Sequence, residues 1–212
     1  MKVVEIFNSI EGEGKRIGLP ATFIRFFGCN MKCIYCDSVY ACEGTDYKEM
    51  SIDDILQVVE EIGCPNITIT GGEPLIQQDI TELLQKLSDK NYEINVETNG
   101  SIMPSFRHLN VFYTVDYKTH SSGMTDLVDT DIFETLCMRD VIKFVVGTEE
   151  DMEQAYEFMK TKTTAAYIYI SPVFGQIEPT KLVRFVQNHR LWNWRVQVQL
   201  HKVLWNPDMR GV

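Results

Sequence analysis

The 212-residue sequence lacks any apolar run close to the roughly 18 residues that a membrane-spanning helix needs. Its first residues, Met1 to Phe7, lack the long apolar stretch and the small-residue cleavage site that are typical of a signal peptide. Internal repeats and low-complexity segments are also missing. We therefore expect a cytoplasmic protein with one domain over residues 1–212, which is long enough to bury a full core.

Positive charge is scarce. The chain has 20 Lys and Arg against 30 Asp and Glu, which gives a net charge of −10. Its longest basic cluster is the pair Lys15-Arg16, so the sequence shows no basic patch of the kind that nucleic-acid-binding proteins carry. We therefore expect neither a nucleic acid nor a membrane among its partners.

Short apolar runs alternate with amphipathic stretches along the chain. The runs that predict strands are 21–27, 66–70, 92–97, 111–115, 141–146, 167–170 and 196–200. The stretches that predict helices are 51–62, 79–87, 149–160 and 179–188. This alternation indicates an α/β fold with βα units around a mostly parallel sheet, either open or as a partial barrel.

Ligands of such folds bind at the carboxyl ends of the strands. Four polar or glycine-rich stretches lie there: the loop after Phe27, Gly71 to Pro74, Glu97 to Gly100, and Asp116 to Lys118. A fifth candidate, Phe7 to Gly14, interleaves two glycines with two carboxylates, which makes a poor strand and a good ligand loop.

Cys29, Cys33 and Cys36 follow directly after the first predicted strand. Their short spacing lets one loop place three thiolates around a single inorganic centre. Ferredoxin-type clusters and structural zinc sites take four ligands, and the next cysteine, Cys42, lies six residues beyond Cys36. Three ligands leave one metal position open for a substrate or cofactor. The spacing alone also permits a zinc site or three packed thiols.

Two motifs resemble those of the radical S-adenosylmethionine (SAM) superfamily. The Cys-x3-Cys-x2-Cys spacing, with Tyr35 before the last cysteine, is similar to its cluster motif, and Gly71-Gly72-Glu73-Pro74 is similar to its Gly-Gly-Glu-Pro motif. The resemblance implies a 4Fe–4S cluster on the three cysteines whose unique iron binds SAM. Electron transfer then yields a 5′-deoxyadenosyl radical. The second motif would offer carbonyl and carboxylate acceptors to the SAM amino group.

Two further features suggest ligands. Arg25 interrupts an apolar strand, where a charge is costly unless it pairs with a nearby acid or binds a ligand through its guanidinium fork. Asp37 and Ser38 place hard oxygen donors beside the last cysteine, which suits Mg²⁺, although turn formation is the more common role of such residues.

From Phe7 to Val212 the chain resembles the 7-carboxy-7-deazaguanine synthase family. The family-specific parts are the Ser-x-Glu-Gly-Glu-Gly segment, the His-Lys-x-x-Trp segment and the Arg-Gly-Val ending. This family converts 6-carboxy-5,6,7,8-tetrahydropterin into 7-carboxy-7-deazaguanine with loss of ammonia, in queuosine and 7-deazapurine biosynthesis. It uses SAM catalytically and requires Mg²⁺. The resemblance implies a shortened, partial radical SAM βα barrel.

The resemblance also implies site residues and partners. The residues expected to contact the substrate are Ile10, Glu11, Gly12, Arg25, Thr70 and Val212, and Ser38 is expected to bind Mg²⁺. SAM contacts fall on Tyr35, Cys36, Asp37, Gly72, Asp116, Tyr117, Lys118, Ser171, Pro172, Val173 and Phe174. No side chain is expected to be catalytic, because the SAM-derived radical carries the chemistry. Besides the pterin, we expect an electron donor such as flavodoxin and a homodimer.

Some details differ within the family. Some members carry glutamine in place of Glu11, and some carry threonine in place of Ser38. Cys42, Cys64 and Cys137 match no functional position, so we expect them to pack as small hydrophobic residues.

Two alternatives are a small radical SAM activase of a glycyl radical enzyme and a zinc-stabilised binding module. The match beyond the shared motifs argues against the activase.

Overall fold

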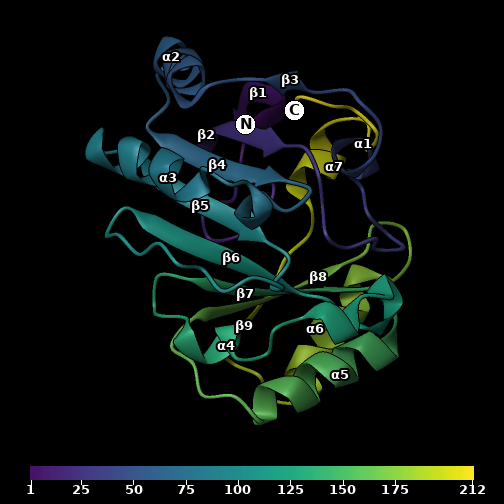
Figure 1. The fold of residues 1–212 in the computed structure, drawn as a ribbon. Helices are drawn as coiled ribbons and strands as arrows, with labels where there is room; N and C mark the ends of the chain where they lie inside the picture. The colour runs from purple at the N-terminus through teal and green to yellow at the C-terminus, as the bar shows by residue number, and fades with distance from the viewer.

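The computed structural model describes residues 1–212 and contains one nine-stranded sheet (Figure 1). The strands are β1 (Lys2–Ile10), β2 (Pro20–Phe26), β3 (Lys48–Glu49), β4 (Asn66–Gly71), β5 (Glu93–Thr98), β6 (Val111–Tyr117), β7 (Val141–Val146), β8 (Tyr167–Pro172) and β9 (Trp194–Val196). Their order is β3-β1-β2-β4-β5-β6-β7-β8-β9. β1 runs antiparallel to β2 and β3, whereas all pairs from β2 to β9 are parallel. The edges do not pair with each other, which confirms the predicted mostly parallel, partial barrel.

The longer helices connect successive parallel strands. The helices are α1 (Val39–Cys42), α2 (Ile52–Ile62), α3 (Ile80–Asp89), α4 (Ile132–Thr135), α5 (Glu149–Lys160), α6 (Pro179–Asn188) and α7 (Leu200–Leu204). Short 3₁₀ turns are η1 (Pro74–Ile76), η2 (His120–Ser122) and η3 (Thr125–Leu127). None of the helices has both the length and the apolar character that crossing a bilayer requires.

Local sequence signals explain where the longer helices begin. Ser51 and Thr148 each form a capping box with the acidic residue three positions later, which satisfies free N–H groups in the first turn. Pro179 stands in the first turn of α6, where its missing N–H costs nothing. These signals confirm the helix starts predicted from the sequence.

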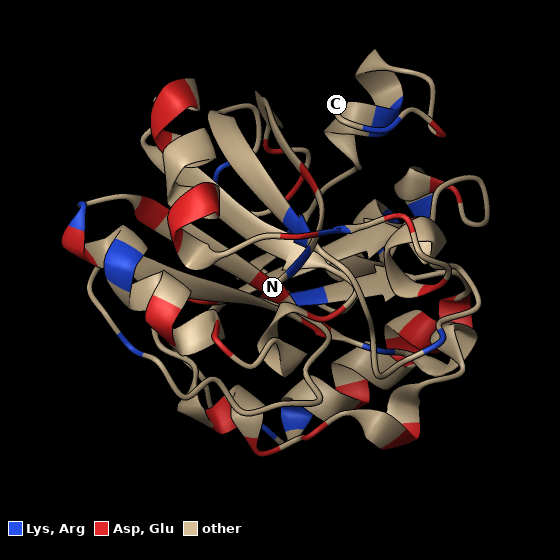
Figure 2. Cartoon of the chain, turned by 45° about the horizontal axis from the view of Figure 1, so that its top comes forward, with Lys and Arg blue, Asp and Glu red and all other residues tan.

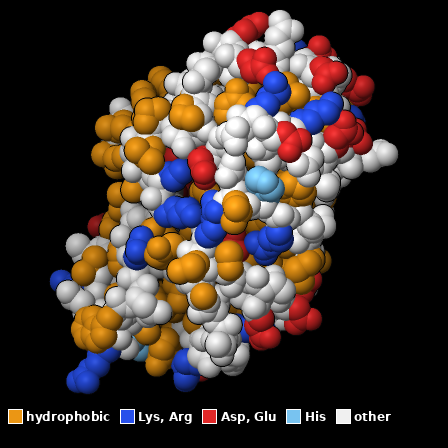
Figure 3. Space-filling view, turned by 90° about the vertical axis from the view of Figure 1, so that its left-hand side faces the viewer, with side chains coloured by type: hydrophobic (Ala, Val, Ile, Leu, Met, Phe, Trp, Pro, Cys, Tyr) orange, Lys and Arg blue, Asp and Glu red, His pale blue; other side chains and the backbone are white.

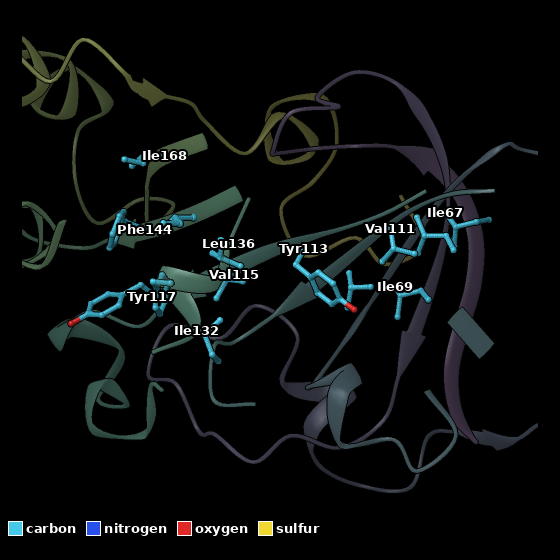
Figure 4. Close-up of a cluster of buried hydrophobic side chains, with 14 of the residues drawn as sticks. Ile67, Ile69, Val111, Tyr113, Val115, Tyr117, Ile132, Leu136, Phe144 and Ile168 are labelled. Atoms are coloured by element: carbon cyan, nitrogen blue, oxygen red, sulfur yellow. The ribbon is translucent and has the colours of Figure 1, made fainter. Parts of the chain in front are cut away.

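The sheet has two unlike faces, because successive side chains of a strand point to opposite sides. In β4, Ile67 and Ile69 are fully buried in a hydrophobic cluster that also contains apolar side chains of α2, α3, α5 and α6. Figure 4 shows both isoleucines with cluster residues of β6, β7 and β8. We call this the outer face. The alternate residues, Thr68 and Thr70, belong to the inner face. The parallel register places Arg25 of β2 beside Thr70, so the inner face is polar where it nears the carboxyl ends.

Two predicted elements differ from the structure. The strand expected at 196–200 is wrong, because β9 ends at Val196 and Leu200 already begins α7. Gln197 N still donates to Ile170 O of β8, and the Gln197 side-chain oxygen accepts a hydrogen bond from Gly14 N. The ligand loop expected at 7–14 is shorter, because Phe7 to Ile10 pair with β2 as part of β1.

Candidate active site

The three motif cysteines lie in the loop between β2 and α1, at the carboxyl end of the parallel strands. All three are half-buried thiols outside any disulfide. The Cys29 sulfur accepts hydrogen bonds from Met31 N at 3.4 Å and from Asn99 Nδ2 at 3.7 Å. No three of the chain's His, Cys, Asp and Glu side chains lie close enough together to hold a single metal ion.

A fourth thiol lies beside two of these cysteines. The short helix α1 brings Cys42 near Cys29 and Cys36, although it is separated from them in sequence, and its Sγ donates to Ser38 O at 3.6 Å. Hydrogen bonds from Cys42 lower the pKa of Cys29 to about 6 and that of Cys36 to about 7. Cys42 was expected to pack as a small hydrophobic residue, but it lies beside two motif cysteines instead. The same expectation is wrong for Cys137, which is exposed, whereas Cys64 is half-buried.

Gly72 allows the end of β4 to lie directly against the cysteine loop. A Cβ at this position would lie 2.0 Å from Gly28 O and 2.9 Å from the Cys29 Cβ. Any larger residue would push the two motifs apart, so the structure requires glycine here. The close seam between the two motifs fits a cluster and a SAM molecule that are shared between them.

Glu73 takes a different role from the one expected. Its side chain is fully buried and accepts hydrogen bonds from Leu75 N, Thr98 Oγ1 and Asn99 N at 2.7–3.0 Å. Burial raises the pKa of this carboxyl to about 7, even though the hydrogen bonds act in the opposite direction. The carboxylate therefore fastens the loop after β5 to the glycine motif. This structural role adds to the predicted contact with a SAM amino group, which stays a prediction.

Charged side chains meet on the inner face beside the cysteine loop. The Lys143 ammonium lies 3.2 Å from Glu13 Oε2 and 3.8 Å from Asp116 Oδ2, and Lys118 lies 2.9 Å from the same Asp116 oxygen. Ser171 Oγ donates to Glu13 Oε1 at 3.2 Å. Figure 2 shows such red and blue segments close together near the centre of the molecule as well as on the helices. The second Asp116 oxygen, Oδ1, is buried without a partner, which fits a ligand hydroxyl.

Lys143 and Glu13 also belong to this group of charges, although neither was predicted as a site residue. Lys143 interrupts the apolar run of β7 as Arg25 interrupts that of β2, and this signal could have identified it. Glu13 stands in the loop that was singled out, but only the fold places it against β7 and β8. Its pKa is lowered because Lys143 and His201 outweigh the effect of burial.

The remaining SAM candidates lie along these carboxyl ends in different orientations. The Tyr117 ring packs into the core between Phe133, Phe144 and Phe158, so only its main chain can reach a ligand. Tyr35 Oη donates to Val145 O at 3.2 Å. Ser171, Pro172 and Val173 are buried at the end of β8, whereas Phe174 is half exposed.

Arg25 pairs with a nearby acid, which is one of the two alternatives that the sequence left open, and its contact with the substrate stays a prediction. Its Nε donates to Glu5 Oε1 at 2.7 Å, and its Nη1 lies 3.5 Å from Ser38 Oγ. Ser38 Oγ donates to Asp37 Oδ1 at 3.0 Å. Next to Arg25, Thr70 Oγ1 donates to Glu97 Oε2 at 2.9 Å. The magnesium candidate Ser38 thus contacts the substrate candidate Arg25, which lies beside Thr70 in the sheet.

The C-terminal tail returns to the strand that carries the other substrate candidates. A groove of about 270 Å³ is lined by Asn8, Ser9, Ile10, Pro20, Trp205, Gly211 and Val212. The Lys202 ammonium of α7 pairs with Asp37 Oδ2 at 2.9 Å, which ties the tail to the cysteine loop. Val212 and Ile10 thus meet, although 201 residues separate them in sequence.

Glu11 lies deeper than the other substrate candidates. Its side chain is 2% exposed and pairs with Arg16 at the 2.6 Å distance between Arg16 Nη2 and Glu11 Oε1. Gly12, the next candidate, packs against the His201 ring and accepts a hydrogen bond from Leu200 N. The loop from β1 to β2 therefore reaches both α7 and the interior of the sheet.

Comparisons with known proteins agree with this geometry. The Radical SAM superfamily profile matches residues 23–121. The 7-carboxy-7-deazaguanine synthase of Clostridium acetobutylicum is 44% identical over 100% of this chain and 99% of its own length, and that of Chlorobaculum tepidum is 37% identical over 100% and 97%.

A solved structure extends the likeness to three dimensions. The crystal structure of QueE from Escherichia coli superposes with a TM-score of 0.77 at 27% identity, and the match covers 93% of both chains. Sequence and fold thus agree over nearly the whole length. The chain belongs to the 7-carboxy-7-deazaguanine synthase family of radical SAM enzymes.

Proposed function

We propose that this protein converts 6-carboxy-5,6,7,8-tetrahydropterin into 7-carboxy-7-deazaguanine with loss of ammonia. One observation supports this most strongly: the inner face carries Arg25 next to Thr70, and Ser38 lies 3.5 Å from the Arg25 guanidinium, directly beside the cysteine loop. A radical generated at the cluster would therefore form next to a polar pocket with a fixed guanidinium. This arrangement suits a small anionic heterocycle better than a protein side chain.

When bound, the cluster and SAM would supply the radical chemistry that hydrogen abstraction from the pterin needs. Cys29, Cys33 and Cys36 would hold the cluster. Asp116, through its unpaired Oδ1, and the main chain around Gly72 would orient SAM. Lys118 and the buried Lys143 compensate the negative charge of Asp116, which holds this carboxylate in place.

The substrate residues match the groups that the pterin presents. Ser38 would bind Mg²⁺ with water and substrate oxygens as its other ligands, because Mg²⁺ keeps few protein ligands. Arg25 would pair with the substrate carboxylate through the nitrogen atoms that Glu5 leaves free. Val212 would accept pterin N–H groups through its terminal carboxylate. These side chains bind and orient the substrate, while the surrounding residues exclude water.

Several properties remain predictions from the sequence. We expect a reduced carrier such as flavodoxin to deliver the electron. A homodimer, a single domain over residues 1–212 and a cytoplasmic location are likewise expected.

The proposed function is tested by anaerobic incubation of the cluster-loaded protein with SAM, dithionite, Mg²⁺ and the carboxytetrahydropterin. Mass spectrometry should detect the deazaguanine product and ammonia, with SAM regenerated. Omission of Mg²⁺ should slow the reaction, and a Cys36→Ala protein provides the negative control. SAM cleavage without the deazaguanine product would reject the proposal in favour of another radical SAM reaction, such as activation of a glycyl radical enzyme.

A further inference from the structure

The loop between β1 and β2 carries a buried ion pair beneath the substrate candidates. Arg16 Nη2 lies 2.6 Å from Glu11 Oε1, and Arg16 Nε lies 3.2 Å from the same oxygen. The two side chains are only 9% and 2% exposed. Charges this inaccessible need both a partner and further hydrogen bonds to remain in a folded protein.

Arg16 obtains those hydrogen bonds from the beginnings of two central strands. Its Nη2 donates to Ile67 O and to Thr68 Oγ1, and its Nη1 donates to Glu93 O, each at 2.9 Å. The guanidinium thereby links β4, β5 and the loop at the amino ends of the strands. Figure 3 looks onto this end of the sheet, where Lys and Arg side chains gather near the middle of the surface.

Glu11 uses only half of its carboxylate in these contacts. The hydrogen bonds from Arg16 and from Thr68 Oγ1 all reach Oε1, so Oε2 has no partner within the protein. Thr68 lies two residues before the substrate candidate Thr70 on the inner face, which is a distance of about 7 Å along β4. Glu11 contacts Thr68 and therefore lies below Thr70 in the sheet. The second oxygen thus remains without a protein partner beneath the proposed pterin site.

We propose that Arg16 is a positioning residue of the substrate site, which fixes the Glu11 carboxylate and neutralises its charge so that an anionic pterin can bind above it. The inference rests on the proposed function. Without the guanidinium, a buried negative charge would face a substrate that is itself negative, and like charges in a poorly solvated site repel strongly. A displaced Glu11 would also disturb Gly12, which packs against His201 of α7.

The experiment compares Arg16→Met, the double variant Arg16→Met/Glu11→Gln and the control Lys15→Met. Lys15 belongs to the same loop, but its ammonium contacts Arg139 O and the Phe112 ring and not Glu11. Arg16→Met should raise KM for the carboxytetrahydropterin about ten- to a hundredfold, because a charged hydrogen bond is lost. SAM affinity and iron content should stay unchanged. The double variant should recover most of the loss, because a neutral amide needs no counter-charge, and Lys15→Met should keep the KM of the parent protein.

An unchanged KM in folded Arg16→Met would overturn the inference. So would equal losses of SAM affinity, pterin affinity and melting temperature with no recovery in the double variant, because they would show a purely structural role. Absence of turnover in the parent protein would instead reject the proposed function, which separates the two failures.

Discussion

The outer and inner faces of the sheet are made by the same strands but are held together by different forces. On the outer face of β4, Ile67 and Ile69 are fully buried among aliphatic and aromatic side chains. One residue further along the strand, Thr68 and Thr70 hydrogen-bond to the carboxylates of Glu11 and Glu97. Burial of apolar area stabilises the first face, whereas compensated charges arrange the second for ligands. Substitutions on the two faces should therefore separate stability from function.

The largest effect on activity is expected in the cysteine loop, at the carboxyl ends of the strands. Cys33→Ala removes one of three proposed cluster ligands, so we expect loss of the cluster and of turnover, measured as iron content and visible absorbance. Cys42→Ala is the matched control, since it removes a thiol that contacts Cys29 and Cys36 but leaves all three ligands. Full iron content in Cys33→Ala would contradict the assignment.

A large effect on the free energy of unfolding is expected from substitutions on the outer face. Ile69→Ala opens a cavity in the core and should reduce the free energy of unfolding by about 2–5 kcal/mol. Ile69→Val should cost only about 0.5–1.5 kcal/mol. Both values can be measured by denaturant titration. Below the melting temperature, KM for the pterin should stay unchanged in both variants, and a changed KM would show that the faces are not independent.

The outer face could be predicted from the sequence much better than the inner face. Runs such as Asn66 to Thr70 predict strands by their β-branched residues, and Ser51 and Thr148 mark helix starts, because these signals are local. Motif spacing likewise identified the cysteine loop. The β1 strand was missed because Glu5, Asn8 and Ser9 obscure its apolar pattern.

Contacts between distant segments could not be predicted from local signals. The pairing of Glu13 with Lys143 spans 130 residues, and only the sheet order brings the two together. Cys42 reaches Cys29 because α1 reverses the chain, which a spacing rule cannot show. Glu11 and Arg16 are close in sequence, yet their burial depends on the beginnings of β4 and β5.

A pH-dependent effect is expected at Glu73, which joins the glycine motif to the loop after β5. Its pKa is raised to about 7 by burial, so the folded state holds this proton more tightly than the unfolded state does. The stabilisation is complete below the usual glutamate pKa of about 4.3 and is lost as the pH rises through about 7. Between pH 5 and pH 8 the free energy of unfolding should fall by about 2–3 kcal/mol more in the parent protein than in Glu73→Gln. Equal falls, measured by denaturant titration at both pH values, would contradict this interpretation.

A smaller effect, on binding only, is expected at the C-terminus. A tag after Val212 moves the terminal carboxylate out of the groove that Ile10 and Trp205 line. Loss of one charged hydrogen bond should weaken pterin binding by about 1.5–3 kcal/mol, measured as KM. The same tag before Met1, at the opposite end of the chain, is the control. Met1 contacts Met50 there and does not line the groove. Equal KM values for the two tagged proteins would show that the tail is not part of the site.

The smallest effect on stability and binding is expected at Thr70, which follows Ile69 and lies on the inner face. Thr70→Val keeps the shape of the side chain but removes the hydroxyl that donates to Glu97 Oε2 at 2.9 Å. The stability cost should be about 1 kcal/mol, the usual value for one hydrogen bond. KM for the pterin should nevertheless rise several-fold, because Glu97 would lose the donor that orients it beside Arg25.

Thr70→Val and Ile69→Ala together test whether the inner face serves binding while the outer face serves stability. Thr70→Val should leave the denaturation midpoint nearly unchanged while it raises KM, and Ile69→Ala should do the reverse. Thr70→Ser, which restores the hydroxyl, should recover KM even though it removes a methyl group. If Thr70→Val lowers stability as much as Ile69→Ala and leaves KM unchanged, Thr70 is a packing residue and the inner face at β4 does not bind the substrate.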